Sequence, residues 1–528
     1  MSDTANEREI RLGKLARLRE IGYDPYAVES FPFTETAENL KDTTAQREGE
    51  VVPFAGRIVS RREMGKSQFL HLSDGADRFQ IYVRKNDIDD AAWEALNLLD
   101  LGDHLGVVGS LFITKTGEPS LQVSELKPLS KSLHVVPIPK QRGEEQWYGL
   151  TDTNVRFRHR HLDLITNPDA RRTLVDRSRI VTAVRRCFNA WGYLEVETPM
   201  LQQEAGGAAA RTFSAHYNAY DLEVDLRISL ELYLKRILCG DIPRVYEIGR
   251  VFRNEGVSNR HNPEFTLLEF YEAYADLEVM MQRVEDLFRT VATEVFGSPL
   301  VRIKRESQDG DIVSEDVAGF SEDEVVLDFG KPWRRVDLLS AIEEHSGLTA
   351  EDLSSLQNAK AALKNRNVVN PVTGKRINAE EERHLGGLIE KLLEVFVEPH
   401  LQEPSFVIGY PLETSPLAKK DPNRPGFTRR FEGYVLGREI CNAFSEINDP
   451  IDQRERFQAQ MAERASGDDE AHPMDEDFLY ALESGMPPTG GCGIGMDRMV
   501  MLLTGARHIR QVMFFPMMRP EGHAPDED

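Results

Sequence analysis

Hydrophobic and polar residues alternate in two neighbouring stretches near the middle of the chain, and this pattern predicts two β-strands joined by a polar loop. The first strand covers 245–255, and the second begins at Phe265. Gly256 and the polar residues after it interrupt the alternation, as is typical of a loop. One face of the second strand carries an aromatic ring, an acid and a phenol in Phe265, Glu269 and Tyr271. Such a set is unusual for a hydrophobic core.

Cationic side chains collect in the loop of this predicted hairpin. Arg253, Arg260 and His261 are groups of the kind that bind phosphates, because they donate charged hydrogen bonds. The alternative is a surface hairpin held by a network of salt bridges, which is common in globular proteins.

Five short strand-like runs lie between 51 and 129, separated by Gly and Asp turns. They predict a closed barrel of the OB type, and we assign it to a domain over 49–140. Such barrels often bind single-stranded nucleic acid, although a barrel can also serve packing alone.

Helical and basic segments lie on either side of the predicted barrel. Apolar residues recur at helical spacing over 5–21, within a helical extension that we assign to 1–48. The basic residues of this helix either contact RNA or form a solvated face. A linker is expected at 141–169, and its dense basic cluster at 156–161 either lies beside RNA or holds the two domains together.

A larger domain is expected over 170–520. It opens with a helix that ends at Gly192 and a strand that closes at Pro199. An exposed acidic insertion is expected near 305–325, and a helical insertion around 336–400.

A second hairpin is predicted near the C-terminal end, with its turn near Gly437. Asn442, Phe444 and Glu446 alternate onto one face of its second strand. Glu439 has the opposite parity, so it reaches the same site only if a β-bulge lies between them.

Length and composition describe an ordinary globular protein with room for two or more domains: 528 residues, 40% hydrophobic and 29% charged. The formal charge of 64 − 88 = −24 argues against indiscriminate nucleic-acid binding, although local basic patches can still bind RNA. No apolar run reaches membrane-spanning length, no signal peptide follows Met1, and the four cysteines lack metal-type spacing. We therefore expect a cytoplasmic protein with reduced thiols and no membrane contact.

Three stretches of the larger domain resemble the motifs of class II aminoacyl-tRNA synthetases. The sequence 252–265 resembles motif 2, and its spelling is closest to that of the lysyl enzymes. The helix and strand over 170–199 resemble motif 1, which builds the dimer interface in that family. Three alternate glycines and an apolar helix over 491–516 resemble motif 3, with Arg498 as its ATP-binding arginine. A dinucleotide-binding fingerprint would need a different glycine spacing.

The resemblance implies a fold, a reaction and an assembly. The fold is α+β, with an antiparallel sheet flanked by helices behind the OB-type barrel, and the assembly is a homodimer. In the implied reaction, the lysine carboxylate attacks the α-phosphorus of ATP, giving lysyl-adenylate and pyrophosphate. The terminal ribose hydroxyl of tRNA(Lys) then takes the lysyl group.

The same resemblance implies which residues handle ATP. Arg253 bridges the amino-acid carboxylate and the α-phosphate, and Arg498 holds the γ-phosphate, so both count as catalytic. Phe265 stacks on adenine with Arg498 on its other face. Glu432 and Glu439 carry Mg²⁺, a hard ion that suits carboxylates and phosphates. The other expected ATP contacts are Glu255, His261 and Asn262.

A pocket selective for lysine needs acids at two places, because lysine has two ammonium groups. The resemblance assigns Glu231 to the α-ammonium, and Glu446 with Tyr271 to the ε-ammonium. Aspartyl enzymes of the same fold would instead need cations where the substrate side chain ends. An acid, Glu446, stands at that place here, which argues for lysine. The other expected lysine contacts are Gly207, Arg253, Asn442 and Phe444.

The stretch 55–75 resembles the anticodon-binding domain of lysyl enzymes. On that match Phe69 stacks on an anticodon base, while Arg61, Gln80 and Glu125 bind base edges or backbone. Two alternatives stay open: a paralogue that modifies a translation factor, which would lack the barrel, and an RNA-binding protein without enzymatic activity.

Overall fold

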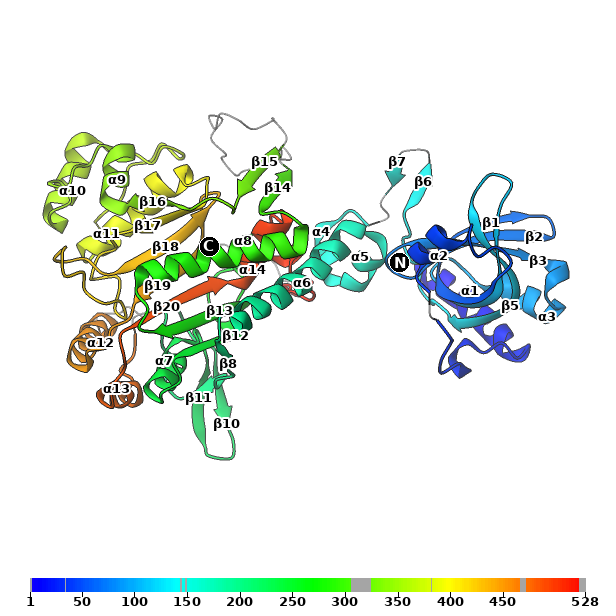
Figure 1. Cartoon of the computed structure of the whole chain (residues 1–528), viewed down its shortest axis with the longest axis horizontal. Helices are drawn as coiled ribbons and strands as arrows, with labels where there is room; N and C mark the ends of the chain where they lie inside the picture. Colours follow the sequence, from blue (N-terminus) through cyan, green and yellow to red (C-terminus); the bar gives the residue numbers. More distant parts are fainter. Residues whose placement is uncertain are drawn as a thin grey trace. The chain divides into compact units, whose positions relative to one another are not determined.

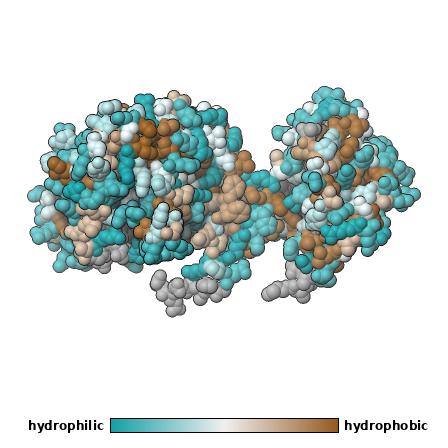
Figure 2. All heavy atoms as spheres, turned by 90° about the horizontal axis from the view of Figure 1, so that it is seen from below, coloured by the Kyte–Doolittle hydropathy of each residue, from teal (hydrophilic) through white to brown (hydrophobic). Residues whose placement is uncertain are grey.

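The chain divides into two compact units, Met1–Arg171 and Arg172–Asp528. Figure 1 traces the elements of the computed structural model. It describes residues 2–33, 35–142, 145–147, 150–304, 324–380, 382–465 and 472–521. The acidic insertion expected near 305–325 lies almost entirely outside the described residues. Figure 2 shows that hydrophilic side chains cover most of one face, with separate apolar patches between them.

A closed barrel of five strands forms the centre of the first unit, in the order β1-β2-β3-β5-β4. All neighbouring strands are antiparallel except β3 and β5, which pair in parallel. Phe54, Leu70 and Ile81 fill its interior with no exposed surface. The predicted barrel is therefore confirmed. Its strands are β1 (Val51–Met64), β2 (Ser67–Ser73), β3 (Arg78–Arg84), β4 (His104–Ile113) and β5 (Pro119–Ser130).

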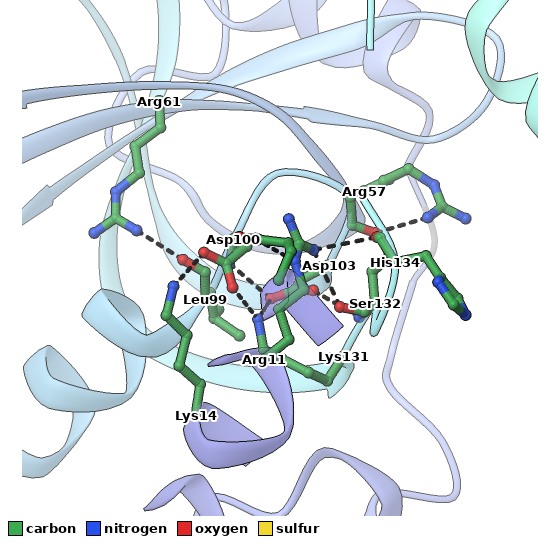
Figure 3. Close-up of polar contacts among 12 residues, drawn as sticks. Arg11, Lys14, Arg57, Arg61, Leu99, Asp100, Asp103, Lys131, Ser132 and His134 are labelled. Carbon is green, nitrogen blue, oxygen red and sulfur yellow. Dashed lines mark hydrogen bonds and ion pairs between the residues drawn. The ribbon is translucent and has the colours of Figure 1, made fainter. Parts of the chain in front are cut away.

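A polar network ties the N-terminal helix to one end of the barrel (Figure 3). Asp100 accepts hydrogen bonds from Lys14 and Lys131, and Asp103 accepts one from Lys131 at 2.7 Å. Lys131 and Asp103 are buried, so each satisfies a charge that water does not reach. The remaining elements of this unit are α1 (Ser2–Glu20), η1 (Pro25–Ala27), α2 (Ala37–Thr43), η2 (Lys85–Asp87), α3 (Asp90–Leu98), β6 (Lys140–Arg142), β7 (Glu145–Trp147), α4 (Thr153–Arg158) and α5 (Arg160–Thr166).

Part of the basic cluster at 156–161 is used inside this unit. Arg160 is buried and donates a hydrogen bond to Asp163 at 2.6 Å, and Arg156 donates to the same carboxylate at 2.7 Å. Asp163 thus offsets the charge of both arginines where α4 meets α5.

An eight-stranded sheet forms the centre of the second unit, in the order β16-β17-β18-β19-β20-β13-β12-β8. Its strands are antiparallel except for the two outermost pairs, β16 with β17 and β12 with β8. The α+β prediction is confirmed. The strands of this sheet are β8 (Leu194–Glu195), β12 (Arg244–Phe252), β13 (Glu264–Ala273), β16 (Arg334–Asp337), β17 (Ser405–Ile408), β18 (Arg430–Val435), β19 (Arg438–Ser445) and β20 (Thr489–Gly495).

Three helices, α6, α8 and α14, cover one face of this sheet and form the main core with it. Along β13, Leu268 and Phe270 point into this core, whereas Leu267 and Glu269 line a cavity on the other face. The alternation of β13 therefore separates core from site. The other elements of this unit are α6 (Pro168–Ala190), α7 (Glu231–Cys239), α8 (Leu277–Phe296), α12 (Pro450–Ala465), α13 (Glu476–Glu483), α14 (Met496–Thr504), η5 (Ile509–Gln511), β9 (Leu201–Gln202), β10 (Ser214–Tyr217), β11 (Leu222–Leu226), β14 (Leu300–Lys304) and β15 (Glu324–Asp328).

The segment 336–400 contributes a second core beside the edge strand β16 and its neighbour β17. Buried residues such as Leu338, Leu363 and Leu388 pack against Val407 and Tyr434 of the sheet. The helices of this segment are α9 (Leu338–Ser346), α10 (Leu356–Arg366), α11 (Leu385–Leu392), η3 (Leu393–Val397) and η4 (Glu398–His400).

Two local predictions have different outcomes. The strand expected to close at Pro199 is only two residues long, because Thr198 donates its backbone N–H and hydroxyl to the Glu247 side chain and does not continue the backbone pairing. The predicted β-bulge is confirmed: Gly433 pairs with Cys441, but Tyr434 pairs with Glu439. The extra residue reverses the parity, and Glu439 joins the site face.

Candidate active site

A cavity of about 510 Å³ lies over the central strands of the eight-stranded sheet. Alternate residues of β13, β19 and β20 form its floor, and the loop between β12 and β13 forms one wall. Gly491 keeps the floor open, because a Cβ there would lie 2.4 Å from the Tyr271 ring and 2.1 Å from Glu446. The structure brings these predicted residues to the cavity: Gly207, Glu231, Arg253, Glu255, His261, Asn262, Phe265, Tyr271, Glu432, Glu439, Asn442, Phe444 and Arg498.

Cations gather at one end of the cavity. The Arg253 guanidinium lies over the Phe265 ring, with its Cζ 5.2 Å from the ring centroid. Burial lowers the pKa of Arg253, and Glu255 opposes that shift. Arg498 donates to the carboxylate of Glu439 at 3.0 Å. This end therefore presents two guanidinium groups, one of them held by an acid.

His261 lies beside Arg498 as a neutral imidazole. The Nη2 of Arg498 lies 3.3 Å from the Nε2 of His261, and a guanidinium can only donate. Burial and the charge of Arg498 lower the pKa of His261. Nearby, Asn262 is buried and uses its amide nitrogen on the Glu264 carbonyl, whereas its Oδ1 has no hydrogen-bond partner among the described residues. The cavity thus offers an acceptor for a ligand N–H.

Two acids, Glu432 and Glu439, line the same cavity as these cations. Glu432 is buried, and its carboxylate accepts hydrogen bonds from Tyr410, Tyr434 and Arg430 at 2.6 to 2.7 Å. Glu439 is more exposed and is paired with Arg498. Among the residues that the structure describes, no cluster of three or more His, Cys, Asp or Glu could hold a metal ion by itself.

Acids crowd the other end of the cavity. Glu231, Glu269 and Glu446 are at most 5% exposed, and the fully buried ammonium of Lys235 pairs with both Glu231 and Glu446. Burial raises the pKa of Glu446, while Lys235 opposes the shift. Glu446 itself is not among the residues that line the cavity, but its Oε1 lies directly next to Gly491, a residue of the cavity floor.

Of these three acids, Glu269 is the one that forms no ion pair with a residue that the structure describes. It accepts hydrogen bonds from the Ser229 hydroxyl at 2.8 Å, the Leu230 backbone at 3.1 Å and the Tyr271 hydroxyl at 2.9 Å. Burial, together with the charge of Glu231, raises the pKa of Glu269 to about 7. Counted as ionised, the three acids and Lys235 carry 1 − 3 = −2.

Several residues of the site were not among the site residues predicted from the sequence. Glu269 had a signal, because it shares a strand face with Phe265 and Tyr271. Lys235 stands four residues after Glu231, which on a helix is equally typical of a surface pair. Arg430 and His472 had no signal in the sequence. Arg430 orients Glu432, and His472 accepts the Gly207 N–H at 2.6 Å.

Three of the four predicted anticodon residues lie on the outer surface of the barrel. Phe69 stacks on Tyr82 with ring centroids 4.5 Å apart, and Gln80 donates to the Ser120 hydroxyl on the neighbouring strand. Glu125 is exposed on β5, which adjoins β3. These three predicted residues lie on the outer surface of β2, β3 and β5.

Arg61 is not brought to this surface. It pairs in register with Leu70, a core residue, and its Nη1 donates to the Leu99 carbonyl at 2.9 Å (Figure 3). Arg62 pairs with Phe69 instead, so Arg62 shares the face of Phe69.

Known families match both units. Residues 152–519 match the family described as tRNA synthetases class II (D, K and N), and 52–129 match the OB-fold nucleic acid binding domain. The sheet, its cavity and the barrel thus define a class II aminoacyl-tRNA synthetase.

Full-length relatives narrow the family. The chain is 46% identical over 513 residues to a lysine–tRNA ligase of Syntrophomonas wolfei subsp. wolfei, with 97% of each chain covered. It is 45% identical over 512 residues to that of Moorella thermoacetica, again with 97% of each covered. It is 43% identical over 529 residues to that of Staphylococcus epidermidis, covering 98% of this chain and 100% of the relative. The chain belongs to the lysine–tRNA ligases of class II.

Proposed function

We propose that this chain activates L-lysine with ATP to lysyl-adenylate and pyrophosphate, and then transfers lysine to the 3′ end of tRNA(Lys). The observation that carries the proposal is the acidic end of the cavity. Glu231, Glu269, Glu446 and Lys235 together carry −2 when ionised, and free lysine brings two ammonium groups. A buried excess of negative charge favours a ligand with matching positive charge, and it disfavours aspartate.

The opposite end of the cavity suits the anionic parts of both substrates. In the proposed reaction, Arg253 lies between the lysine carboxylate and the α-phosphate, two anions that otherwise repel. Arg498 binds the γ-phosphate, and Phe265 stacks on adenine. Asn262, Glu255 and His261 complete the nucleotide site, since the free Oδ1 of Asn262 can accept an N–H from the base. Positioning and charge neutralisation are what this chemistry requires.

Mg²⁺ is part of the proposal, with Glu432 and Glu439 as the residues that would hold it. Both carboxylates line the cavity beside the cations, and carboxylate oxygens are the donors Mg²⁺ prefers. Tyr410 and Tyr434 fix Glu432 before any ion arrives. When bound, the ion would neutralise charge on the ATP phosphates.

In the amino-acid pocket, we assign Glu231 to the α-ammonium, and Glu446 with Tyr271 to the ε-ammonium. Gly207, Asn442 and Phe444 shape the walls. Lys235 already pairs with both acids, so substrate ammonium groups share these carboxylates with an internal cation. We add Glu269 to the set, because it lines the cavity and hydrogen-bonds Tyr271.

The domain at 49–140 is proposed to read the anticodon, ahead of a linker at 141–169 and a catalytic domain at 170–520. Phe69 offers an aromatic face, and Gln80 and Glu125 offer hydrogen-bonding groups on the same outer surface. We propose Arg62 in place of Arg61 as the cation of this surface. Presence of the barrel favours a tRNA ligase over the paralogue that modifies a translation factor, and the assembled cavity favours an enzyme over a mere RNA-binding protein.

A homodimer is proposed through the motif 1 segment. Val175, Leu194, Met200 and Leu201 are 47 to 54% exposed. They come from α6, the edge strand β8, the segment after β8, and strand β9. Exposed large apolar residues near an open sheet edge are typical of an interface. Sedimentation should give twice the chain mass, and Leu201→Asp should shift the measured mass toward that of the monomer.

Within the described residues, none of the helices is long and apolar enough to cross a membrane. A cytoplasmic location stays part of the proposal.

ATP–pyrophosphate exchange tests the function directly. Exchange should depend on lysine and not on aspartate or asparagine, and tRNA(Lys) should then be charged. Exchange supported by aspartate, or lysine exchange without tRNA charging, would overturn the assignment.

A further inference from the structure

His472 lies between α12 and α13 and is only 3% exposed. Its Nδ1 lies 2.8 Å from the Pro473 carbonyl, which can only accept, so Nδ1 carries the hydrogen. Its Nε2 is therefore free to accept, and it accepts the backbone N–H of Gly207 at 2.6 Å. Burial lowers the pKa of His472 to about 4, and the charges of Lys235 and Arg464 act in the same direction. The imidazole is neutral at pH 7.

Gly207 belongs to a tight loop that passes between His472 and the acidic end of the cavity. Its φ of +89° is in the left-handed region that favours glycine. A Cβ on Gly207 would lie 2.9 Å from the Ser229 hydroxyl and 3.1 Å from the Glu231 Cβ. On the other side, a Cβ on Gly206 would lie 2.6 Å from the His472 ring. The loop backbone is therefore packed directly between the imidazole and Glu231.

The imidazole is held from its other side by α12. It stacks on the Phe457 ring with centroids 4.7 Å apart and planes 12° apart. The His472 backbone N–H donates to Gln460 at 3.2 Å. Both contacts come from one helix, so the height of the Gly207 loop over the pocket is fixed by a rigid element.

We propose that His472 is a positioning residue for the amino-acid pocket. Its neutral imidazole anchors the Gly207 N–H, which fixes the loop over Glu231 and thereby sets the affinity for the amino acid. His472 touches no reacting atom. This inference rests on the proposed assignment of Glu231 and its neighbours to the lysine pocket.

Two substitutions separate the anchor from the packing. His472→Phe keeps a ring against Phe457 but has no acceptor for the Gly207 N–H. His472→Gln places an amide oxygen near the Nε2 position and gives up the ring. Both are compared in full-length protein by ATP–pyrophosphate exchange, with lysine titrated at saturating ATP and ATP titrated at saturating lysine.

The anchor predicts a split between the two substrates. His472→Phe should raise KM for lysine about tenfold, the expected consequence of one buried N–H without a partner. KM for ATP and kcat should stay within about twofold, and His472→Gln should restore lysine KM to within about threefold of the wild type. If His472→Phe does not fold, His472→Asn serves, because its shorter amide cannot reach Gly207.

Two results would overturn the inference. Unchanged lysine KM in folded His472→Phe or His472→Asn would show that the loop needs no anchor. An equal rise in KM for both substrates would indicate general loosening. Glu231→Gln, measured in parallel, distinguishes failure of the His472 inference from failure of the pocket assignment. Unchanged lysine KM in Glu231→Gln would mean that Glu231 does not belong to the lysine pocket.

Discussion

Replacing Glu446 by glutamine is the sharpest test of the acidic pocket. Glu446 has no exposed surface, and its carboxylate pairs with the buried ammonium of Lys235. Gln keeps the shape, which matters because Glu446 packs closely on Gly491, where even an added Cβ would lie 2.1 Å from the Glu446 Oε1. The substitution therefore removes one charge with little change in packing.

The size of the effect follows from how the charges are shared. A buried ammonium that loses its charge partner costs about 2–5 kcal/mol, or about one and a half to three and a half decades in affinity. Lys235 keeps Glu231 as a counter-ion, but Glu231 is then less available to the substrate. Because the loss is shared in this way, we expect KM for lysine to rise about thirtyfold to a few hundredfold, near the lower end of that range.

The assay is ATP–pyrophosphate exchange over a lysine titration at saturating ATP, with the ATP titration as its counterpart. Glu272→Gln is the matched control: Glu272 is also buried and paired, with Arg244 and Arg283, but it lies on the opposite face of β13 from the cavity. The control should lower the melting temperature and leave lysine KM unchanged. Wild-type lysine KM in a folded Glu446→Gln variant would refute the reasoning, because the ε-ammonium would then be read elsewhere.

Three further predictions concern the other parts of the molecule. Arg253→Ala should slow adenylate formation by about a hundredfold or more, because carboxylate and α-phosphate lose their shared counter-charge; near-normal exchange would remove Arg253 from the mechanism. Phe69→Ala and Gln80→Ala should leave lysine-dependent exchange intact and weaken tRNA charging, by about 1–3 kcal/mol for the lost stacking contact; reduced lysine activation with normal charging would contradict an anticodon role. The pKa of Glu269, raised to about 7, leaves this acid protonated below that pH in the empty pocket, so KM for lysine should fall as pH rises through 7; a flat profile between pH 6 and 8, or the same profile in Glu269→Gln, would exclude Glu269.

The alternation of apolar residues was sufficient to predict the barrel strands and the two hairpins of the catalytic sheet. Each of these strands has one buried face, so the period of two is visible in the sequence. The strand expected before Pro199 failed for a different reason. There the backbone N–H of Thr198 is satisfied by the Glu247 side chain, and nothing in the local pattern marks a contact between residues so far apart in sequence.

For two predicted site residues, the face of the strand on which the side chain lies decided whether the prediction held. In both strands, an irregularity in the pairing register set that face. At Glu439, the sequence showed the conflict with Asn442, so the bulge could be predicted and was confirmed. At Arg61, a shift in register between Ile58 and Ser60 reverses the alternation of β1 and turns Arg61 toward the core side. The sequence did not indicate this shift, because Arg61 and Arg62 are neighbours of the same residue type. Whichever of the two faces outward, an arginine lies on the outer surface.

Lys235 shows why the charge balance of a site is harder to predict than its residues. In sequence, Glu231 and Lys235 form an ordinary pair four residues apart on a helix, worth a few tenths of a kcal/mol at a surface. In the fold, both are buried, and Glu446, the residue after β19 and more than two hundred positions later in the sequence, pairs with the same ammonium. Three ionised acids without Lys235 would repel one another and take up protons, whereas a second internal cation would leave too little charge to hold a substrate with two ammonium groups. One buried lysine therefore keeps the acids together and still leaves the pocket short of two positive charges, which is the number that free lysine supplies.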